Sequence, residues 1–299
     1  MLLQTIIVFG QVNPQLINFW DNTYLINSAS VTPKYMSEFI VSNRSQWVGV
    51  QGAPKTMMFT GSYCNTDFTS QIGAKIVSDK IGYSDITAAS LIYSYYIDFA
   101  FSRLSFGLTG NYTNFNFDPT KITSFETSDP YLNFAYEVKN KINSDVGIEY
   151  TARTSKIGLS AVNLFDLFSN KNNFNQNINY LYYVYRSQND ALFNLGYGLA
   201  LINNRFNTQL EFNINSYIRY DLDELPIQLG VTIRTWNQYA FNGGLYLGEN
   251  IKILYTFELN RSDFGQQTNG THELMLRYRI NRARNWGSKN YFENLLFHY

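Results

Sequence analysis

The stretch FNTQLEFNINSYIRY, Phe206 to Tyr220, alternates between two sets of side chains, one mostly apolar and one mostly polar. An alternation with a period of two is typical of a β-strand, because successive side chains point to opposite faces of a sheet. These fifteen residues exceed the usual strand length of about five or six, but they suit a tilted strand that crosses a bilayer and extends beyond it. One face carries Phe206, Thr208, Leu210, Phe212, Ile214, Ser216, Ile218 and Tyr220, and the other carries Asn207, Gln209, Glu211, Asn213, Asn215, Tyr217 and Arg219.

The same alternation recurs along the chain, in LSFGLTGNY (104–112), IQLGVTIRT (227–235), IKILYTFEL (251–259) and ELMLRYRI (273–280). The polar faces carry mostly Asn, Gln, Ser, Thr and Gly with few charges, whereas the outer faces of a soluble sheet protein are rich in Lys and Glu. Tyr and Phe gather near strand ends, as in SLIYSYYIDF (90–99) and INYLYYVYR (178–186). This distribution favours an all-β transmembrane barrel with aromatic girdles over a soluble β-sandwich binding module.

Composition excludes several other classes of protein. Charged residues make up 15% of the 299 residues, against about 25% in a typical soluble domain. The 23 basic and 23 acidic residues balance, so no nucleic-acid partner is expected. The only cysteine is Cys64 and the only histidines are His272 and His298, so we expect no disulfide, metal, cofactor or catalytic set. His272 and Glu273 are neighbours on a predicted strand and therefore face opposite sides.

Turn signals divide the chain into about fourteen candidate strands, an even number that places both ends of a bacterial barrel in the periplasm. The predicted spans are 37–48, 55–64, 70–78, 86–98, 101–114, 144–153, 155–163, 177–187, 190–202, 205–220, 225–235, 238–247, 249–261 and 270–281. By parity, the long segments Asp118 to Asn143 and Asn163 to Asn177 are extracellular, unless a strand has been miscounted.

We divide the chain into four parts: 1–10, the remnant of a signal peptide or alternatively a buried strand; 11–36, a periplasmic or lumenal segment; 37–281, the barrel; and 282–299, a C-terminal tail. The sequence contains no run of 18 apolar residues, so it predicts no transmembrane helix.

Four segments in collinear order carry a resemblance to a known family. They are RSQWVGVQGAPKT (Arg44 to Thr56), VSDKIG (Val77 to Gly82), RLSFGLTGNY (103–112) and GTHELMLRYRI (270–280). Together they resemble the motifs of the PorP/SprF family, outer-membrane barrels of the type IX secretion and gliding system of Bacteroidetes. The chain departs from the family in INSASVTPKY (26–35), which keeps Asn27 and Ala29 but lacks the usual Pro and Gly.

The resemblance implies a non-enzymatic, integral outer-membrane protein of a Gram-negative bacterium. It implies that the barrel holds a secreted adhesin through the adhesin's C-terminal domain, or links periplasmic secretion components or peptidoglycan-associated lipoproteins to the membrane. The alternative is a channel for hydrophobic or small polar solutes. Candidate family-motif or docking residues are Arg44, Gln46, Trp47, Gly49, Gly52, Ala53, Pro54, Thr56, Asp79, Lys80, Gly82, Gly270, His272 and Glu273.

Two features of the sequence allow more than one interpretation. The segment from Arg44 to Thr56 reads either as a docking site or as a periplasmic hairpin that only fixes the register, and Asp79, Lys80 and Gly82 read as a turn with a local ion pair. The inward faces of the last five strands mix charges of both signs, which fits either a plugged barrel or an ordinary wet lumen. These predicted lumen-lining residues are Glu211, Arg219, Arg234, Lys252, Glu258, Glu273, Arg277 and Arg279.

Overall fold

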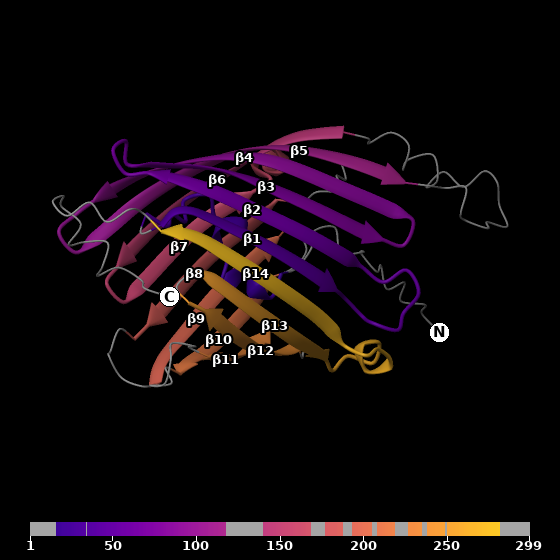
Figure 1. Cartoon of the computed structure of the whole chain (residues 1–299). Coiled ribbons are helices and arrows are strands. Elements are labelled where there is room, and N and C mark those ends of the chain that lie inside the picture. Colours follow the sequence, from indigo (N-terminus) through magenta and orange to yellow (C-terminus); the bar gives the residue numbers. More distant parts are fainter. Residues whose placement is uncertain are drawn as a thin grey trace.

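A single antiparallel sheet closes into a barrel through the pairing of β1 with β14, the indigo and yellow strands that lie side by side in Figure 1. The fourteen strands are β1 Tyr35–Ser45, β2 Lys55–Asn65, β3 Ser70–Ile81, β4 Ser84–Asp98, β5 Ser102–Phe117, β6 Asn140–Ala152, β7 Ser155–Val162, β8 Ile178–Arg186, β9 Phe193–Asn204, β10 Thr208–Ile218, β11 Ile227–Arg234, β12 Gln238–Leu247, β13 Ile251–Asn260 and β14 Thr271–Asn281. This computed structural model describes residues 16–33, 35–117, 140–168, 177–187, 193–204, 208–218, 227–234, 238–248 and 250–281. The predicted all-β barrel of about fourteen strands is confirmed.

The apolar faces of the strands point out of the barrel. In β10, Leu210 and Ile214 are exposed on the outside, whereas Glu211 and Asn213 are buried inside. The same alternation holds in β14, where Leu276 is exposed and Arg277 is buried. A continuous apolar outer belt of this kind is stable only against lipid, so the soluble β-sandwich alternative is wrong.

The two ends of the barrel carry different parts of the chain. β1 begins and β14 ends at one end, which we call the termini end, and residues 46–54 connect β1 to β2 at the other, which we call the hairpin end (right in Figure 1). Every odd-numbered strand ends at the hairpin end, and every even-numbered strand begins there. Residues 118–139 and 169–176 lie outside the described residues, but the described strands on either side of them, β5 to β8, follow this rule. By strand parity, a periplasmic hairpin and extracellular long segments are therefore incompatible expectations.

Exposed aromatic side chains line both rims of the outer belt, as the sequence predicts. Such girdles mark the interfaces between lipid and water. Those towards the termini end are Tyr63, Tyr93, Tyr95, Tyr150, Tyr197 and Tyr278, and those towards the hairpin end are Tyr83, Tyr112, Tyr255 and Phe264.

Some predicted strand ends are wrong for local reasons. β1 stops at Ser45 rather than at residue 48, because the Gln46 N–H bonds to the Pro54 carbonyl and Trp47 adopts a φ of 47°. β5 extends to Phe117 and β6 begins at Asn140, so the connection between them is shorter than predicted.

Residues 16–33, which we call the plug, lie inside the barrel. They form two short 3-10 helices, η1 (Asn18–Trp20) and η2 (Thr23–Leu25), and nearly every plug residue is buried. The plug starts near the hairpin end, where Ile17 and Asn18 contact Glu273 of β14, and it reaches β1 at the termini end. The predicted signal remnant 1–10 and the predicted tail 282–299 lie outside the described residues.

Candidate functional site

Hydrogen bonds hold the plug at the hairpin end. The Trp20 indole Nε1 donates to Glu211 Oε1 of β10 at 2.6 Å. The backbone N–H groups of Ile17 and Asn18 donate to the two carboxylate oxygens of Glu273 at 3.2 and 3.3 Å. Because all these groups are buried, each lost bond leaves a polar group that water cannot satisfy.

Further hydrogen bonds continue towards the termini end. The Asn27 amide donates to Tyr182 Oη of β8 at 3.0 Å and also to the Ile148 carbonyl of β6 at 3.2 Å. Near the termini end, the Thr32 N–H donates to Gln71 Oε1 at 2.9 Å. The plug is thus bonded along its whole described length to strands on several sides of the barrel.

Apolar packing accompanies these bonds on one side of the lumen. Plug residues and inward-facing wall residues form one buried cluster in which the Phe19 and Trp20 rings lie 4.4 Å apart. The burial of this apolar surface stabilises the docked plug through the hydrophobic effect, which does not require a particular contact geometry. The cluster consists of Phe19, Trp20, Leu25, Ile26, Met58, Tyr182, Val184 and Ala200.

Glycines on the inner wall make room for the plug. A methyl group at Gly107 would overlap the backbone of Ser28 and Ala29, and one at Gly147 would overlap the Asn27 side chain. Gly107 belongs to the motif RLSFGLTGNY, so this motif contributes the seat for the middle of the plug.

An ion pair joins the plug to the wall nearer the termini end. The Lys252 ammonium of β13 contacts the Asp21 carboxylate, and Gln228 Nε2 donates to the same carboxylate at 3.1 Å. Burial by itself raises the pKa of Asp21, but the charges of Lys252, Arg186 and Arg277 outweigh it and hold the pKa well below its usual value. Asp21 is therefore ionised in the docked plug.

Three of the four motif segments meet in one row across adjacent strands. Glu273 of β14 is the register partner of Arg44 of β1, Arg44 is that of Thr56 of β2, and Thr56 is that of Asp79 of β3. Arg44 Nη1 lies 3.2 Å from Glu273 Oε2, and Thr56 Oγ1 donates to Asp79 Oδ1 at 2.6 Å. All four side chains are inside the barrel and at most 3% exposed. We call these four residues the seam row.

The seam row continues into a network of buried charges. Arg44 Nη2 lies 3.5 Å from Glu258 Oε1, and Arg234 bridges Glu258 at 3.3 Å and Glu211 at 2.5 Å. Since Glu211 also accepts from Trp20, one network ties the closing strands of the barrel to the plug.

Backbone contacts join the same motifs at the hairpin end. The Val48 N–H donates to the Gly270 carbonyl at 2.9 Å, and the Gly82 N–H donates to the Gly52 carbonyl at 2.9 Å. Gly52 has a φ of 74°, and a Cβ there would lie 3.3 Å from the Gly82 Cα, so a side chain would strain the backbone and crowd Gly82. The Trp47 ring packs edge-on against Phe264 at 5.2 Å.

The candidate motif residues thus separate by position. Arg44, Thr56, Asp79 and Glu273 are buried in the lumen, and Gln46, Pro54 and Gly270 are buried at the hairpin end. The exposed ones are Gly49, Gly52, Lys80 and Gly82, and the half-buried ones are Trp47, Ala53 and His272.

The predicted turn at Asp79, Lys80 and Gly82 is wrong for its first two members. Both lie within β3 and only Gly82 is in the turn. Asp79 points inward to Thr56, whereas Lys80 points outward and lies 3.7 Å from Asp85.

His272 and Glu273 face opposite sides of β14, as predicted. His272 Nδ1 lies 2.6 Å from Tyr255 Oη on the outer face, while Glu273 is buried in the lumen. Among the described residues, no group of His, Cys, Asp and Glu has the arrangement of a metal site. No helix in the described part of the chain is long and apolar enough to span a membrane.

The predicted lumen-lining residues are buried on the inner wall, except Arg219, which lies outside the described residues. Glu211, Arg234, Lys252, Glu258 and Glu273 bond to the plug or to one another. Arg279 pairs with Glu38 of β1, its register partner.

Comparison with known proteins identifies the family. The sequence matches the family described as type IX secretion system membrane protein PorP/SprF over residues 8–278. The chain belongs to the PorP/SprF family. It is therefore a type IX secretion system membrane protein, and its closed barrel with an apolar outer belt makes it an integral outer-membrane protein.

Solved structures support the fold of this PorP/SprF protein. The monoaromatic hydrocarbon channel CymD is 9% identical, with a TM-score of 0.56 over 88% of this chain and 93% of that one. The Pseudomonas putida toluene transporter TodX is 7% identical, with a TM-score of 0.51 over 88% of this chain and 94% of that one. Identities this low show a shared barrel fold and nothing about substrate. No curated protein matches the chain.

The plug contacts were not predicted from the sequence. The segment INFWDNTYLINSAS, Ile17 to Ser30, is rich in aromatic residues and Asn but has no period of two. The strand sequences did contain one indication of the plug. Gly107, Gly147 and Gly198 occupy inward-facing positions, where most other inward-facing residues have polar side chains. Glycines inside strands mark the close approach of another backbone or a ligand.

Proposed function

We propose that this PorP/SprF protein works as a closed-lumen barrel that holds a secreted surface adhesin through the adhesin's C-terminal domain. We also propose that it links the outer membrane to periplasmic type IX secretion components or to peptidoglycan-associated lipoproteins. The plug is the observation that carries the proposal. Within the described part of the chain, buried and hydrogen-bonded plug residues occupy the lumen, which argues against a path for solutes and favours the two rims as the working surfaces.

The two rims have different candidate roles. With an even number of strands, the termini end faces the periplasm and the hairpin end faces the cell exterior. In this orientation we expect the long segments 118–143 and 163–177 at the extracellular rim, together with the exposed residues Gly49 and Gly52 of the hairpin and Lys80 of β3. These parts are the candidates for adhesin docking, and the short periplasmic turns are the candidates for contact with the machinery.

The buried seam row supports a structural role for part of the family motif. A partner reaches Arg44, Thr56, Asp79 or Glu273 only if the plug leaves, since these side chains face the filled lumen. The motif therefore combines residues that close the barrel with a hairpin surface that is free to dock.

Co-purification from detergent-solubilised outer membranes tests the proposal. We expect a tagged chromosomal copy to retain an exported surface protein and type IX components, and we expect deletion of the gene to remove that protein from the cell surface. A preparation that retains neither, from cells whose surface proteins are unchanged by the deletion but whose solute uptake falls, would establish the channel alternative instead.

Charge reversals on opposite rims make the test directional. Lys80 is exposed at the hairpin end and Arg153 is exposed in the turn at the termini end. We expect Lys80→Glu to weaken adhesin retention and Arg153→Glu to leave it unchanged. The reverse pattern would place the docking surface on the periplasmic rim.

A further inference from the structure

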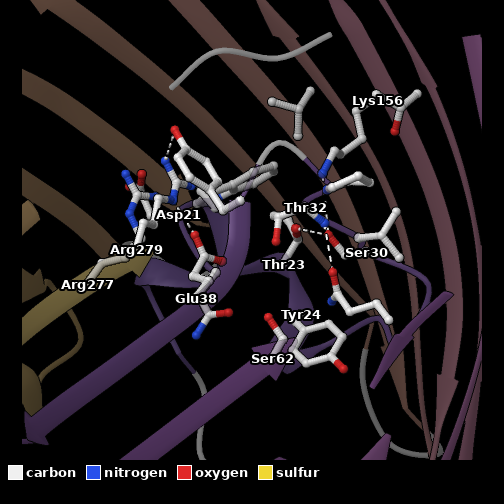
Figure 2. A pocket seen from close by; sticks show the side chains of 18 of the residues that line it. Asp21, Thr23, Tyr24, Ser30, Thr32, Glu38, Ser62, Lys156, Arg277 and Arg279 are labelled. Atoms are coloured by element: carbon white, nitrogen blue, oxygen red, sulfur yellow. Dashed lines mark hydrogen bonds and ion pairs between the residues drawn. The ribbon is translucent and has the colours of Figure 1, made fainter. Parts of the chain in front are cut away.

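A cavity of about 100 Å³ lies inside the barrel at the termini end, between the plug and the wall. Figure 2 shows that its side chains come from the plug and from inward faces of strands on several sides of the barrel. Five cationic side chains but only two carboxylates line it, which gives it an excess of positive charge. The cations are Arg103, Lys156, Arg186, Arg277 and Arg279, and the carboxylates are Asp21 and Glu38.

Most of the surrounding carboxylates already belong to ion pairs. Glu38 pairs with Arg279, and Asp21 pairs with Lys252, which is the register partner of Arg277 on β13. Two carboxylates outside the cavity lining compensate two more of the cations, because Asp98 pairs with Arg103 and Glu149 pairs with Lys156.

Among the residues that the structure describes, Arg277 has no direct ion pair, and its charge acts on the carboxylates of Asp21 and Glu38 only from beyond ion-pair distance. Its side chain is 3% exposed and lines the cavity, and within the described part of the chain no carboxylate lies within ion-pair distance of it. Its guanidinium lies 5.9 Å from the centroid of the Tyr246 ring, a distance at which a cation–π contact is weak. A buried guanidinium without a directly paired anion is unfavourable, because longer-range attraction alone does not repay its desolvation.

We infer that this cavity binds one small oxyanion group, a carboxylate or a phosphate, with Arg277 as its principal ligand. A guanidinium presents paired N–H donors that match both anions. A volume of about 100 Å³ has room for one group of this size. The inference goes beyond the proposed function, because it assigns a ligand site at the periplasmic mouth whichever protein docks on either rim.

Titration calorimetry on the full-length protein in detergent tests the inference with three probes: inorganic phosphate, triglycine and triglycine amide. We expect saturable binding of phosphate, of triglycine or of both at one site per barrel, and none of the amide. Binding of phosphate alone identifies a free phosphate site, and binding of triglycine alone identifies a polypeptide carboxylate. Failure of all three probes to bind saturably, or equal binding of triglycine and its amide, would overturn the inference.

Two variants locate the bound anion. We expect Arg277→Gln to weaken the affinity at least about tenfold, the effect of losing a charge-assisted pair. Lys80→Gln removes a cation at the opposite end and should leave the affinity unchanged. Unchanged affinity in Arg277→Gln would also overturn the inference. If Arg277→Gln does not fold, Arg277→Lys, which keeps the charge but loses the paired donors, should still bind several-fold more weakly than the wild type.

Discussion

Arg44 and Glu273 face each other across the strand pair that closes the barrel, with Arg44 Nη1 3.2 Å from Glu273 Oε2 and both side chains 1% exposed. They lie 229 positions apart in the sequence, in the first and last of the four family motifs. The same carboxylate accepts the backbone N–H groups of Ile17 and Asn18 from the plug. Glu273 thus helps to close the barrel through Arg44 and also helps to hold the plug in the lumen. These two contacts give a physical reason why two motifs so distant in sequence occur in one chain.

Arg44→Met should destabilise the barrel by about 3–5 kcal/mol, because it leaves Glu273 and Glu258 buried with less positive charge to compensate them. Urea unfolding of the protein in lipid vesicles measures the change. Lys80→Met breaks the exposed pair with Asp85 and should cost no more than about 1 kcal/mol. If both variants lose the same free energy of unfolding, the buried pair of Arg44 and Glu273 stabilises the barrel no more than the exposed pair of Lys80 and Asp85 does.

Gly107→Ala should displace the middle of the plug, because the added methyl overlaps the backbone of Ser28. Cys64 reports the displacement, since it is 2% exposed and packs against Val31 of the plug. We expect a bulky water-soluble maleimide to label Cys64 slowly in the folded wild type and at least about tenfold faster in Gly107→Ala, a population shift worth about 1.4 kcal/mol.

Gly110→Ala is the matched control for this labelling, because Gly110 lies on the outer face of the same strand with no atom within 4 Å of an added methyl. Its labelling rate should equal that of the wild type. Equal rates in Gly107→Ala and the wild type would show that the plug does not rest against β5.

Leu108→Arg should impair folding into bilayers by about 2–4 kcal/mol, the cost of a cation in the lipid-facing middle of a strand. Leu108 is 56% exposed on the outer face of β5, between the aromatic rims. Asn116→Arg on the same strand is the control, since position 116 already carries an exposed polar side chain beyond the belt. Urea titration of folding into vesicles should separate the two variants, and equal tolerance of both would argue against a lipid-facing β5.

The barrel could be predicted from the sequence because its decisive signal is local. The period of two from Phe206 to Tyr220 predicts which side chains of β10 face lipid, and the alternation of exposed and buried residues in the described strand agrees with it from Thr208 to Asn215. Strand parity similarly placed both ends of the barrel at one rim. The early end of β1 was not predictable in this way, because it depends on Trp47 adopting a positive φ, which is uncommon for a residue other than glycine.

The candidate site was only partly predictable because its contacts are distant in sequence. Trp20 and Glu211 are 191 positions apart, and no local pattern in either segment predicts their hydrogen bond. The sequence showed that the last strands line the lumen with charges of both signs, which left a wet lumen and a plugged one as alternatives. The described plug decides between them, because Asp21 and the Ile17 and Asn18 amides bond to those charges.

Conductance of the purified protein in planar lipid bilayers tests the central claim that the chain's own residues 16–33 close the barrel. We expect insertion of the folded wild-type protein to produce no steady ion current, and deletion of residues 16–33 to produce one in barrels that still fold. A steady current through the wild type, unchanged by that deletion, would contradict the closed lumen and the anchoring function that rests on it.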